Sequence, residues 1–284
     1  MLLPALLLTL VFSYVPMAGV VIAFQDFKPW KGLFDSEWVG FENFAVVFQR
    51  ADAVQVIINT LVISGLKIVF GLIVPFFFAI LLNEVLSRKL QRFIQTLVYL
   101  PHFLSWVILG GILLDLLSPN GMVNGLLNQV GVKSIFFLGS NQWFQPVVII
   151  THIWKEFGYS TIIFLATLVG ISPSLYEAAE VDGASRPQQV RYITIPSLLP
   201  ITVVVGVLSL ANILNAGFDQ IFNLYNPLVY ETGDVIDTFV YRIGLVSGQF
   251  GFATAVGLFK SIVSLIMIAI GYKLADKYAN YRIF

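Results

Sequence analysis

Residues 175–200 read LYEAAEVDGASRPQQVRYITIPSLLP, a long polar stretch that separates two apolar segments of the chain. It contrasts with a composition that is 58% hydrophobic and only 11% charged, with a mean hydropathy of +0.87. Soluble globular domains carry about 25% charged residues, so a water-soluble protein of this size could not bury so much apolar surface. The chain is therefore expected to be an integral membrane protein with this polar stretch outside the bilayer.

Apolar runs long enough to cross a bilayer recur along the whole sequence. A membrane-spanning helix needs about 20 mostly apolar residues, whereas the strands of membrane β-barrels show short alternating segments. We expect an all-α fold with about six transmembrane helices in one domain over residues 1–284, at residues 2–25, 57–83, 93–117, 144–171, 200–221 and 252–273.

Basic residues concentrate in three segments that a six-span topology places on one side of the membrane. The first joins the second and third apolar runs, the second is the quoted stretch and the third is the C-terminal tail. Cytoplasmic loops carry the excess of Lys and Arg, so both termini and the quoted stretch are expected in the cytoplasm. The residues concerned are Arg88, Lys89, Arg92, Arg186, Arg191, Lys273, Lys277 and Arg282.

Several chemistries are excluded by composition. The chain has no cysteine and only two histidines, which excludes thiolate metal sites and a histidine-based metal cluster. It has no GxxxxGK[ST] loop for nucleotide phosphates, so we expect no ATP binding by this chain. Its first residues, MLLPALLLTL, lack the basic start of a secretory signal, so we expect a membrane-anchored natural N-terminus that is shortened here.

The quoted stretch predicts two short helices joined by a turn. Ser172 can cap a helix over 173–181, since Pro173 suits the first helical position. Gly183 tolerates the left-handed conformation that ends helices. Pro187 can open a second helix, and Pro196 is expected to end it before the next apolar run.

The same stretch resembles the EAA loop of permeases of ATP-binding cassette (ABC) importers, whose signature is EAA-x3-G-x9-I-x-LP. Ile195 stands where that signature has leucine, a conservative departure, and Asp182 and Ala184 also suit the family. The matching positions are Glu177, Ala178, Ala179, Gly183, Ile193 and Pro196.

This resemblance implies a type I ABC importer-like fold, in which the EAA loop, residues 172–199, forms a coupling helix seated on a separate ATPase. The expected coupling residues are Glu177, Ala178, Ala179, Asp182, Gly183, Ala184 and Pro196. The expected partners are a second permease, two ATPase subunits and an extracytoplasmic solute-binding protein, in a bacterial inner membrane and without nucleic acid. ATP and Mg would bind the ATPases, so this chain would carry no cofactor and would not itself be an enzyme.

Other stretches are similar to the sugar-importing branch of the family, so a sugar or oligosaccharide is the expected cargo. They are VGFENF at 39–44, the segment from Arg92 to Pro101, and YNP at 225–227. Three other classes remain open at this point: a permease for a non-sugar solute, a self-sufficient secondary transporter or channel, and a membrane scaffold without transport activity.

Polar side chains inside the fourth and fifth apolar runs are the candidates for substrate contact, because ionisable groups within membranes usually mark a pathway or a pair. Sugar importers of this family bind substrate with the middles of these spans. The fourth run has four such residues at helical spacing, His152, Lys155, Glu156 and Tyr159. The fifth run has three, Asn212, Asn215 and Asp219. Alternatively, these groups hold helices together.

Lys155, Lys67 and Lys260 lie within apolar runs, where a charge needs a compensating partner. We expect Glu156 to compensate Lys155 only partly, so Lys155 favours an acidic cargo such as alginate or pectin fragments. It could instead pair with a partner permease or line a wet cavity. Lys67 and Lys260 are expected to reach the membrane surface or face a partner subunit, and His102 to be a satisfied interface residue.

Overall fold

Long apolar helices dominate the computed structural model, which describes residues 2–279. Residue 1 and residues 280–284, with Arg282 of the basic tail, lie outside the described residues, as does the side chain of Lys277. Within the described part of the chain, four helices are long and apolar enough to cross a membrane, or up to six if each sharply bent pair forms one span. The chain is an all-α integral membrane protein, as predicted.

The N-terminal half begins with one continuous helical segment and a small hairpin. The elements are α1 Leu2–Thr9, η1 Leu10–Tyr14, η2 Val15–Phe24, β1 Gln25–Asp26, α2 Gly32–Asp35, β2 Glu37–Trp38, α3 Glu42–Gln49, α4 Ala51–Asn83, α5 Arg88–Tyr99, η3 Leu100–Phe103, α6 Trp106–Leu116 and α7 Met122–Gln129. β1 and β2 pair antiparallel, with Gln25 opposite Trp38.

The C-terminal half contains the EAA loop and the second group of long helices. Its elements are α8 Asn141–Val169, α9 Pro173–Val181, α10 Arg186–Gln189, η4 Val190–Thr194, α11 Ile195–Leu210, α12 Phe218–Leu224, η5 Pro227–Val229, α13 Tyr230–Gly233, α14 Ile236–Val240, η6 Tyr241–Val246 and α15 Phe250–Ala279.

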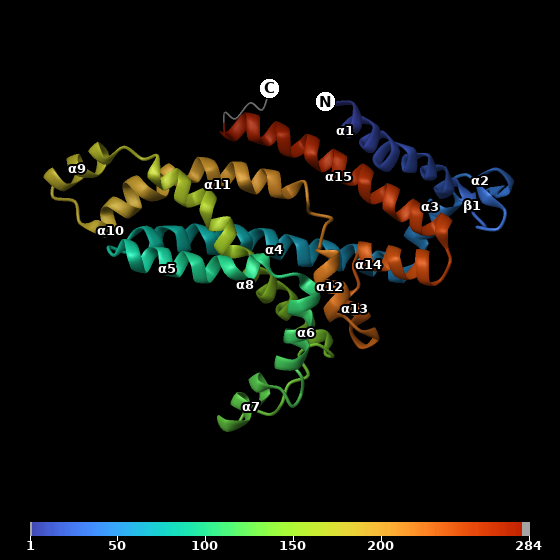
Figure 1. Ribbon diagram of the computed structural model, residues 1–284, viewed down its shortest axis with the longest axis horizontal. Helices are drawn as coiled ribbons and strands as arrows, with labels where there is room; N and C mark the ends of the chain where they lie inside the picture. The colour runs from blue at the N-terminus through green and yellow to red at the C-terminus, as the bar shows by residue number, and fades with distance from the viewer. Residues whose placement is uncertain (1, 280–284) are drawn as a thin grey trace.

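The long helices α4, α11 and α15 run roughly along the longest dimension of the molecule, and α8 crosses it obliquely (Figure 1). α4 packs against α8, and α11 against α15. One core cluster joins α4, α8 and α11 through Phe76, Phe164 and Leu198, and another joins α4 and α8 to α12 through Ile63 and Ile221. α4 and α8 therefore form the central pair on which the other helices assemble.

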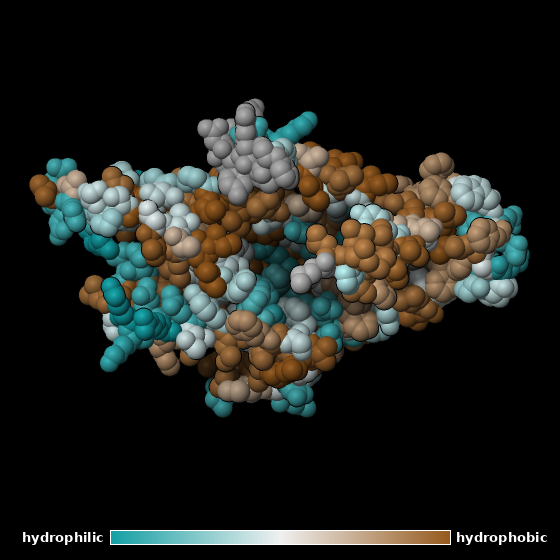
Figure 2. Space-filling model, turned by 45° about the horizontal axis from the view of Figure 1, so that its top comes forward, coloured by the Kyte–Doolittle hydropathy of each residue, from teal (hydrophilic) through white to brown (hydrophobic). Residues whose placement is uncertain are grey.

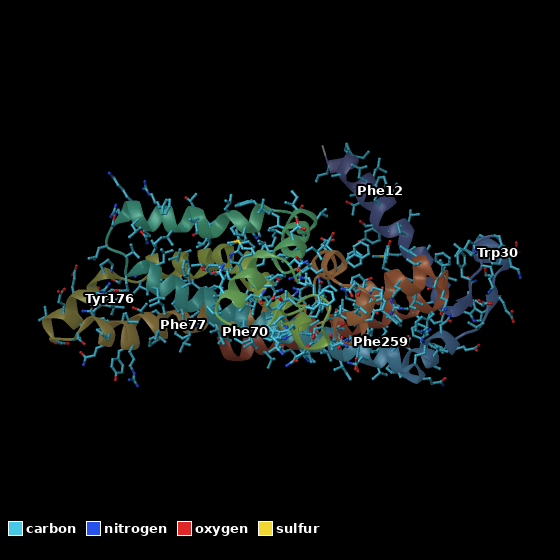
Figure 3. The ribbon with its side chains drawn as sticks, turned by 90° about the horizontal axis from the view of Figure 1, so that it is seen from below. Phe12, Trp30, Phe70, Phe77, Tyr176 and Phe259 are labelled. Atoms are coloured by element: carbon cyan, nitrogen blue, oxygen red, sulfur yellow. The ribbon has the colours of Figure 1, made fainter. Side chains whose placement is uncertain are left out.

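Both ends of the molecule carry polar surface. The EAA loop lies at one end and the β1–β2 hairpin at the other, so that Tyr176 and Trp30 mark opposite ends (Figures 1 and 3). Hydrophilic residues gather at these two ends, and the largely hydrophobic surface between them is interrupted by a hydrophilic hollow near the centre (Figure 2). This arrangement suits a bilayer whose normal follows the long helices.

The third predicted span is wrong as a single helix over 93–117. The segment Arg88–Phe103 is followed, after a two-residue break, by Trp106–Leu116 at an angle of 99°. Pro101 lacks an amide donor, Leu104 and Ser105 are extended, and the Ser105 hydroxyl caps α6 by accepting a hydrogen bond from Ile108 N. These local features break the helix, and α6 and α7 project away from the long helices (Figure 1).

The fifth predicted span, residues 200–221, is displaced toward the N-terminus. Its helix runs continuously over Arg186–Leu210 and does not end at Pro196. A wider π turn at Val190–Thr194 precedes Pro196, whose ring nitrogen has no proton to donate. The helix ends before Asn215, whose side chain accepts from Gly217 N, and Gly217 has φ +90°.

The remaining predicted spans differ from the helices only at their ends. The first helical segment ends at Phe24, α4 starts earlier at Ala51, α8 covers 141–169 and α15 extends over 250–279. These shifts arise because helices extend beyond the apolar window into polar caps.

Candidate functional site

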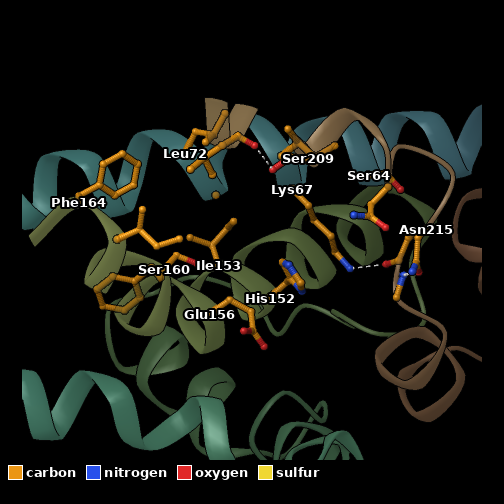
Figure 4. Close-up of a pocket in the computed structure, with 18 residues that line it drawn as sticks. Ser64, Lys67, Leu72, His152, Ile153, Glu156, Ser160, Phe164, Ser209 and Asn215 are labelled. Atoms are coloured by element: carbon orange, nitrogen blue, oxygen red, sulfur yellow. Dashed lines mark hydrogen bonds between the residues drawn. The ribbon is translucent and has the colours of Figure 1, made fainter. Parts of the chain in front are cut away.

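A polar cavity lies between α4, α8, α11 and the segment 211–217 that follows α11, near the middle of the long helices (Figure 4). Its volume is about 390 Å³. Its floor and walls combine aliphatic groups with hydroxyls, amides and charged groups. The polar lining residues are Ser64, Lys67, His152, Glu156, Ser160, Ser209, Asn212 and Asn215.

Four of the residues predicted to contact substrate line this cavity. His152 and Glu156 reach it from α8, while Asn212 and Asn215 reach it from the turn after α11. The prediction that Asn212, Asn215 and Asp219 share one helical face is wrong, because the first two lie in a turn and Asp219 lies on α12. The turn nevertheless brings both asparagines to the polar face of α8.

The other three predicted residues lie outside the cavity lining. Lys155 is buried next to it, with 6% of its surface exposed, and Tyr159 is exposed on α8. Asp219 is exposed on α12. The sequence pattern therefore located the right helix but not the direction in which each side chain points.

Lys155 is fully engaged by neighbours within its own chain. Its Nζ lies 3.0 Å from Glu156 Oε1 and donates a 2.7 Å hydrogen bond to the carbonyl oxygen of His102. The same ammonium lies 5.5 Å from the ring centroid of Trp106. The expectation that Glu156 compensates Lys155 only partly is wrong, because adjacent residues on α8 form a direct ion pair.

His102 completes this cluster from the break in the third predicted span. Its Nδ1 lies 2.7 Å from Glu156 Oε2, and its ring stacks on Tyr159 at a centroid distance of 4.1 Å. His102 is thus satisfied inside the chain, as predicted, but its partner is an acidic residue of α8. We name Lys155, Glu156 and His102 the α8 charge cluster.

Lys67 was predicted to reach the membrane surface or a partner subunit, and the structure contradicts this. It lies near the middle of the 33-residue α4, is 6% exposed and donates 2.6 Å hydrogen bonds to Ala216 O and Gln220 Oε1. Sequence reasoning missed it as a site residue. A lysine deep inside the longest apolar helix was the available signal, because such a charge requires a polar environment.

Lys260 was likewise predicted to reach the surface or a partner, and the structure shows an internal partner for it that the sequence did not indicate. Lys260 on α15 forms an ion pair with Asp237 on α14. The pair joins two neighbouring helices and lies away from the cavity lining.

The EAA loop has a rigid helix–turn–helix geometry. α9 carries Glu177, Ala178 and Ala179, and ends in a Schellman motif in which Gly183 N donates to Glu180 O and Ala184 N donates to Ala179 O. Gly183 has φ +77°, a conformation that other L-residues rarely adopt. Asp182 is the C-cap of α9, and Pro196 lies in the following long helix.

Side-chain contacts fix this loop to the end of α4 and hold its own helices together. Arg186 forms two hydrogen bonds with Glu84 after α4, at 2.8 and 3.2 Å, and its guanidinium lies 5.7 Å from the ring centroid of Tyr176. Tyr176 Oη lies 2.9 Å from Thr194 Oγ1.

The outer face of α9 remains exposed. Glu177, Ala178, Glu180 and Asp182 are solvent-accessible, and Val181 is 88% exposed. An acidic helix with an exposed apolar residue at one polar end of a membrane protein is suited to docking on another protein.

Comparison with known proteins gives the family. The family described as "Binding-protein-dependent transport system inner membrane component" matches residues 67–279, which include α4 from the cavity lysine onward and the whole EAA loop. The chain belongs to this family. Membership argues against the alternatives of a self-sufficient secondary transporter and of a scaffold.

Curated relatives align with the chain from end to end. The polygalacturonan/rhamnogalacturonan transport system permease protein YteP of Bacillus subtilis (strain 168) is 41% identical, with 100% of this chain and 89% of that protein covered. Protein LplB of the same organism is 39% identical, with coverage of 100% and 90%.

Two solved structures share the fold with a TM-score of 0.90. One is a bacterial ABC transporter involved in the import of the acidic polysaccharide alginate, 40% identical, covering 98% of this chain and 94% of that one. The other is a bacterial alginate ABC transporter in complex with an alginate pentasaccharide-bound periplasmic protein, 39% identical, with coverage of 100% and 95%. The ABC importer permease fold predicted from the sequence is therefore confirmed.

A double-mutant cycle tests the ion pair in the α8 charge cluster. Glu156→Gln should destabilise the protein by about 3 kcal/mol, because it leaves the buried Lys155 ammonium without its counter-charge. Lys155→Met should cost less, because Glu156 is part-exposed and keeps its contact with His102. The double variant should lose less than the sum, with a coupling of about 1–3 kcal/mol. Thermal unfolding of the purified protein in detergent measures these differences as shifts of the midpoint.

A matched cycle with Lys155→Met and Asp237→Asn provides the control, since these side chains belong to separate ion pairs. In this control, the midpoint shift of the double variant should equal the sum of the shifts of the two single variants. Additive shifts for Lys155→Met and Glu156→Gln as well would show that the pair contributes nothing to the folded state.

Proposed function

We propose that this chain is the permease subunit of a bacterial importer for oligosaccharides that carry uronate groups. The main support for this proposal is the polar cavity between α4, α8 and α11, because α8 and α11 also connect to the EAA loop. The permease relative that transports polygalacturonan and the alginate importer of the same fold, both similar over nearly the whole chain, support an acidic sugar as cargo.

The cavity chemistry suits a sugar. Hydroxyls of Ser64, Ser160 and Ser209 and amides of Asn212 and Asn215 offer both donors and acceptors. Sugar hydroxyls need this combination, because each hydroxyl donates one hydrogen bond and accepts others. His152 adds a ring beside the amides, stacked on Trp106 with a centroid distance of 6.5 Å.

The EAA loop provides the coupling to ATP hydrolysis in this proposal. α9 would sit in a cleft of a separate ATPase subunit through its exposed face, with Glu177 as the pairing residue. α8 leads into the loop and the helix over Arg186–Leu210 leads out of it. A rigid turn between two helices that both border the cavity can transmit a displacement of the ATPase to the cavity walls.

The complete transporter would contain a second permease, two ATPase subunits and an extracytoplasmic binding protein. ATP and Mg would bind the ATPase subunits, and this chain would bind no cofactor of its own. The alginate transporter with a bound periplasmic protein supports the inclusion of a binding protein.

Both termini and the EAA loop are proposed to face the cytoplasm. The chain has no cysteine, so single cysteines can report the orientation without background. Lys89→Cys beside the EAA-loop end should resist an impermeant thiol reagent added to spheroplasts, and Asp35→Cys near the hairpin should react, since both positions are exposed. Ser36 would be a poor reporter, because it is 7% exposed. Labelling of Lys89→Cys with protection of Asp35→Cys would reverse the orientation.

Cargo and coupling can be tested together in the assembled transporter. The chain, co-expressed with the permease, ATPase and binding protein encoded beside it, is reconstituted in nanodiscs. Oligogalacturonides or alginate oligosaccharides should stimulate ATP hydrolysis several-fold in the wild type. Gly183→Val should remove most of the stimulation while the basal rate remains, because a β-branched residue is strained at φ +77° and displaces α9.

Gly131→Val is the matched control. Gly131 has φ +82°, and a Cβ would meet no atom within 4 Å at either glycine, so the two substitutions impose similar local strain. Gly131 follows α7, far from the EAA loop (Figure 1). Full stimulation in Gly183→Val, or equal loss in both variants, would contradict coupling through the EAA loop. Absence of stimulation by any acidic oligosaccharide in the wild type would contradict the proposed cargo.

A further inference from the structure

Two lysines lie at similar depth in the membrane-spanning part, but their environments differ. Lys155 has an acidic partner at 3.0 Å. Among residues 2–279, no carboxylate forms an ion pair with Lys67, whose hydrogen bonds go to a main-chain carbonyl and a side-chain amide. Lys67 is therefore a buried amino group with no acidic partner among the described residues.

The balance of charge at the cavity leads to the same residue. Glu156 is the acidic group in the lining, and both of its oxygens are already engaged, by Lys155 and by His102. Lys67 and Lys155 are two basic groups beside this one carboxylate. Lys67, unlike Lys155, is part of the lining, and an acidic ligand would favour the charged form of its amino group.

The geometry leaves room for a further ligand at the Lys67 ammonium. An ammonium group has three N–H donors, and hydrogen bonds to Ala216 O and Gln220 Oε1 occupy two of them. Figure 4 shows the Lys67 side chain reaching from α4 across the cavity wall toward the segment that carries Asn215. Gly217 lies beside the same nitrogen, and a Cβ there would lie 3.4 Å from it, so a side chain at this position would occupy space next to the amino group.

We propose that Lys67 forms a carboxylate-binding subsite, in which its ammonium pairs with the carboxylate of a uronate residue while the cargo occupies the cavity. This inference rests on the proposed function and names the residue that selects acidic over neutral sugars. It also transfers that role from Lys155, whose charge Glu156 already neutralises. A cargo carboxylate would supply the third acceptor and the missing negative charge together.

A purely structural role for Lys67 is the competing explanation, since its two hydrogen bonds tie α4 to the segment 216–220. Gln220 separates the two explanations. Its amide receives the bond from Lys67 and donates to Val148 O at 2.8 Å and Thr151 Oγ1 at 2.9 Å. Gln220→Met removes one of the two bonds in this tie and also both bonds from Gln220 to α8, yet it keeps the amino group of Lys67.

The test measures direct binding of digalacturonate and of its carboxyl-reduced, neutral analogue to the permease–ATPase complex in nanodiscs, without the binding protein. Lys67→Met should weaken digalacturonate binding by about tenfold to a hundredfold, the range for loss of a charged hydrogen bond. The neutral disaccharide should bind the wild type and this variant within about threefold. Lys67→Arg and Gln220→Met should retain the preference for the acidic disaccharide.

Equal loss of both sugars in Lys67→Met, or failure of that variant to assemble, would assign Lys67 a structural role and overturn the proposal. The same conclusion would follow if Gln220→Met lost the acidic preference as strongly as Lys67→Met. A wild type that binds both sugars equally would contradict the carboxylate subsite but leave sugar import intact. A wild type that binds neither sugar would contradict the proposed function itself, and the subsite with it.

Discussion

A charge placed midway through a membrane must find a partner, and this requirement organises the centre of the molecule. An unpaired ammonium at that depth costs at least about 2.5–3.5 kcal/mol on insertion scales. The α8 charge cluster satisfies Lys155 with an acid from its own helix and a carbonyl from η3. Lys67 instead donates hydrogen bonds to two amide oxygens that follow α11, Ala216 O and Gln220 Oε1. Each lysine therefore ties a long helix to a segment at which another helical run breaks, and the break after α11 lines the cavity.

The breaks in the helices are as important as the helices themselves. η3 turns the chain so that the carbonyl and ring of His102 both reach α8. Gly158 on α8 permits this approach, because a Cβ there would lie 2.2 Å from Val98 O. The end of α11 at Leu210 similarly releases Asn212 and Asn215 into the cavity lining. Irregular backbone at membrane depth is tolerated where it lines a polar cavity, and both breaks border that part of the molecule.

The sequence predicted those features whose signals are local. The helix and turn of the EAA loop could be predicted because their signals are local: capping residues, a glycine at the helix end and a sequence motif all lie within about 25 residues. The structure shows the predicted α9 and its Schellman turn. The third span could not be recognised as broken from Pro101 alone, since Pro75 and Pro200 lie within continuous helices. Apolar residues also continue past Leu210 between the polar ones, although the helix ends there and Asn215 forms a side-chain turn with Gly217. The partner of a buried charge depends on which segments meet in space, and for this reason the sequence favoured Lys155 over Lys67.

The central claim is that the cavity bordered by α4, α8 and the segment after α11 holds an acidic sugar through Lys67. Cryo-electron microscopy of the assembled transporter in nanodiscs, trapped with an oligogalacturonide and a non-hydrolysing ATPase variant, tests it directly. The account predicts sugar density in this cavity, with a carboxylate within hydrogen-bond distance of Lys67 Nζ and the Lys155–Glu156 pair intact. A side-chain carboxylate of the second permease on Lys67, with the sugar bound elsewhere, would contradict it.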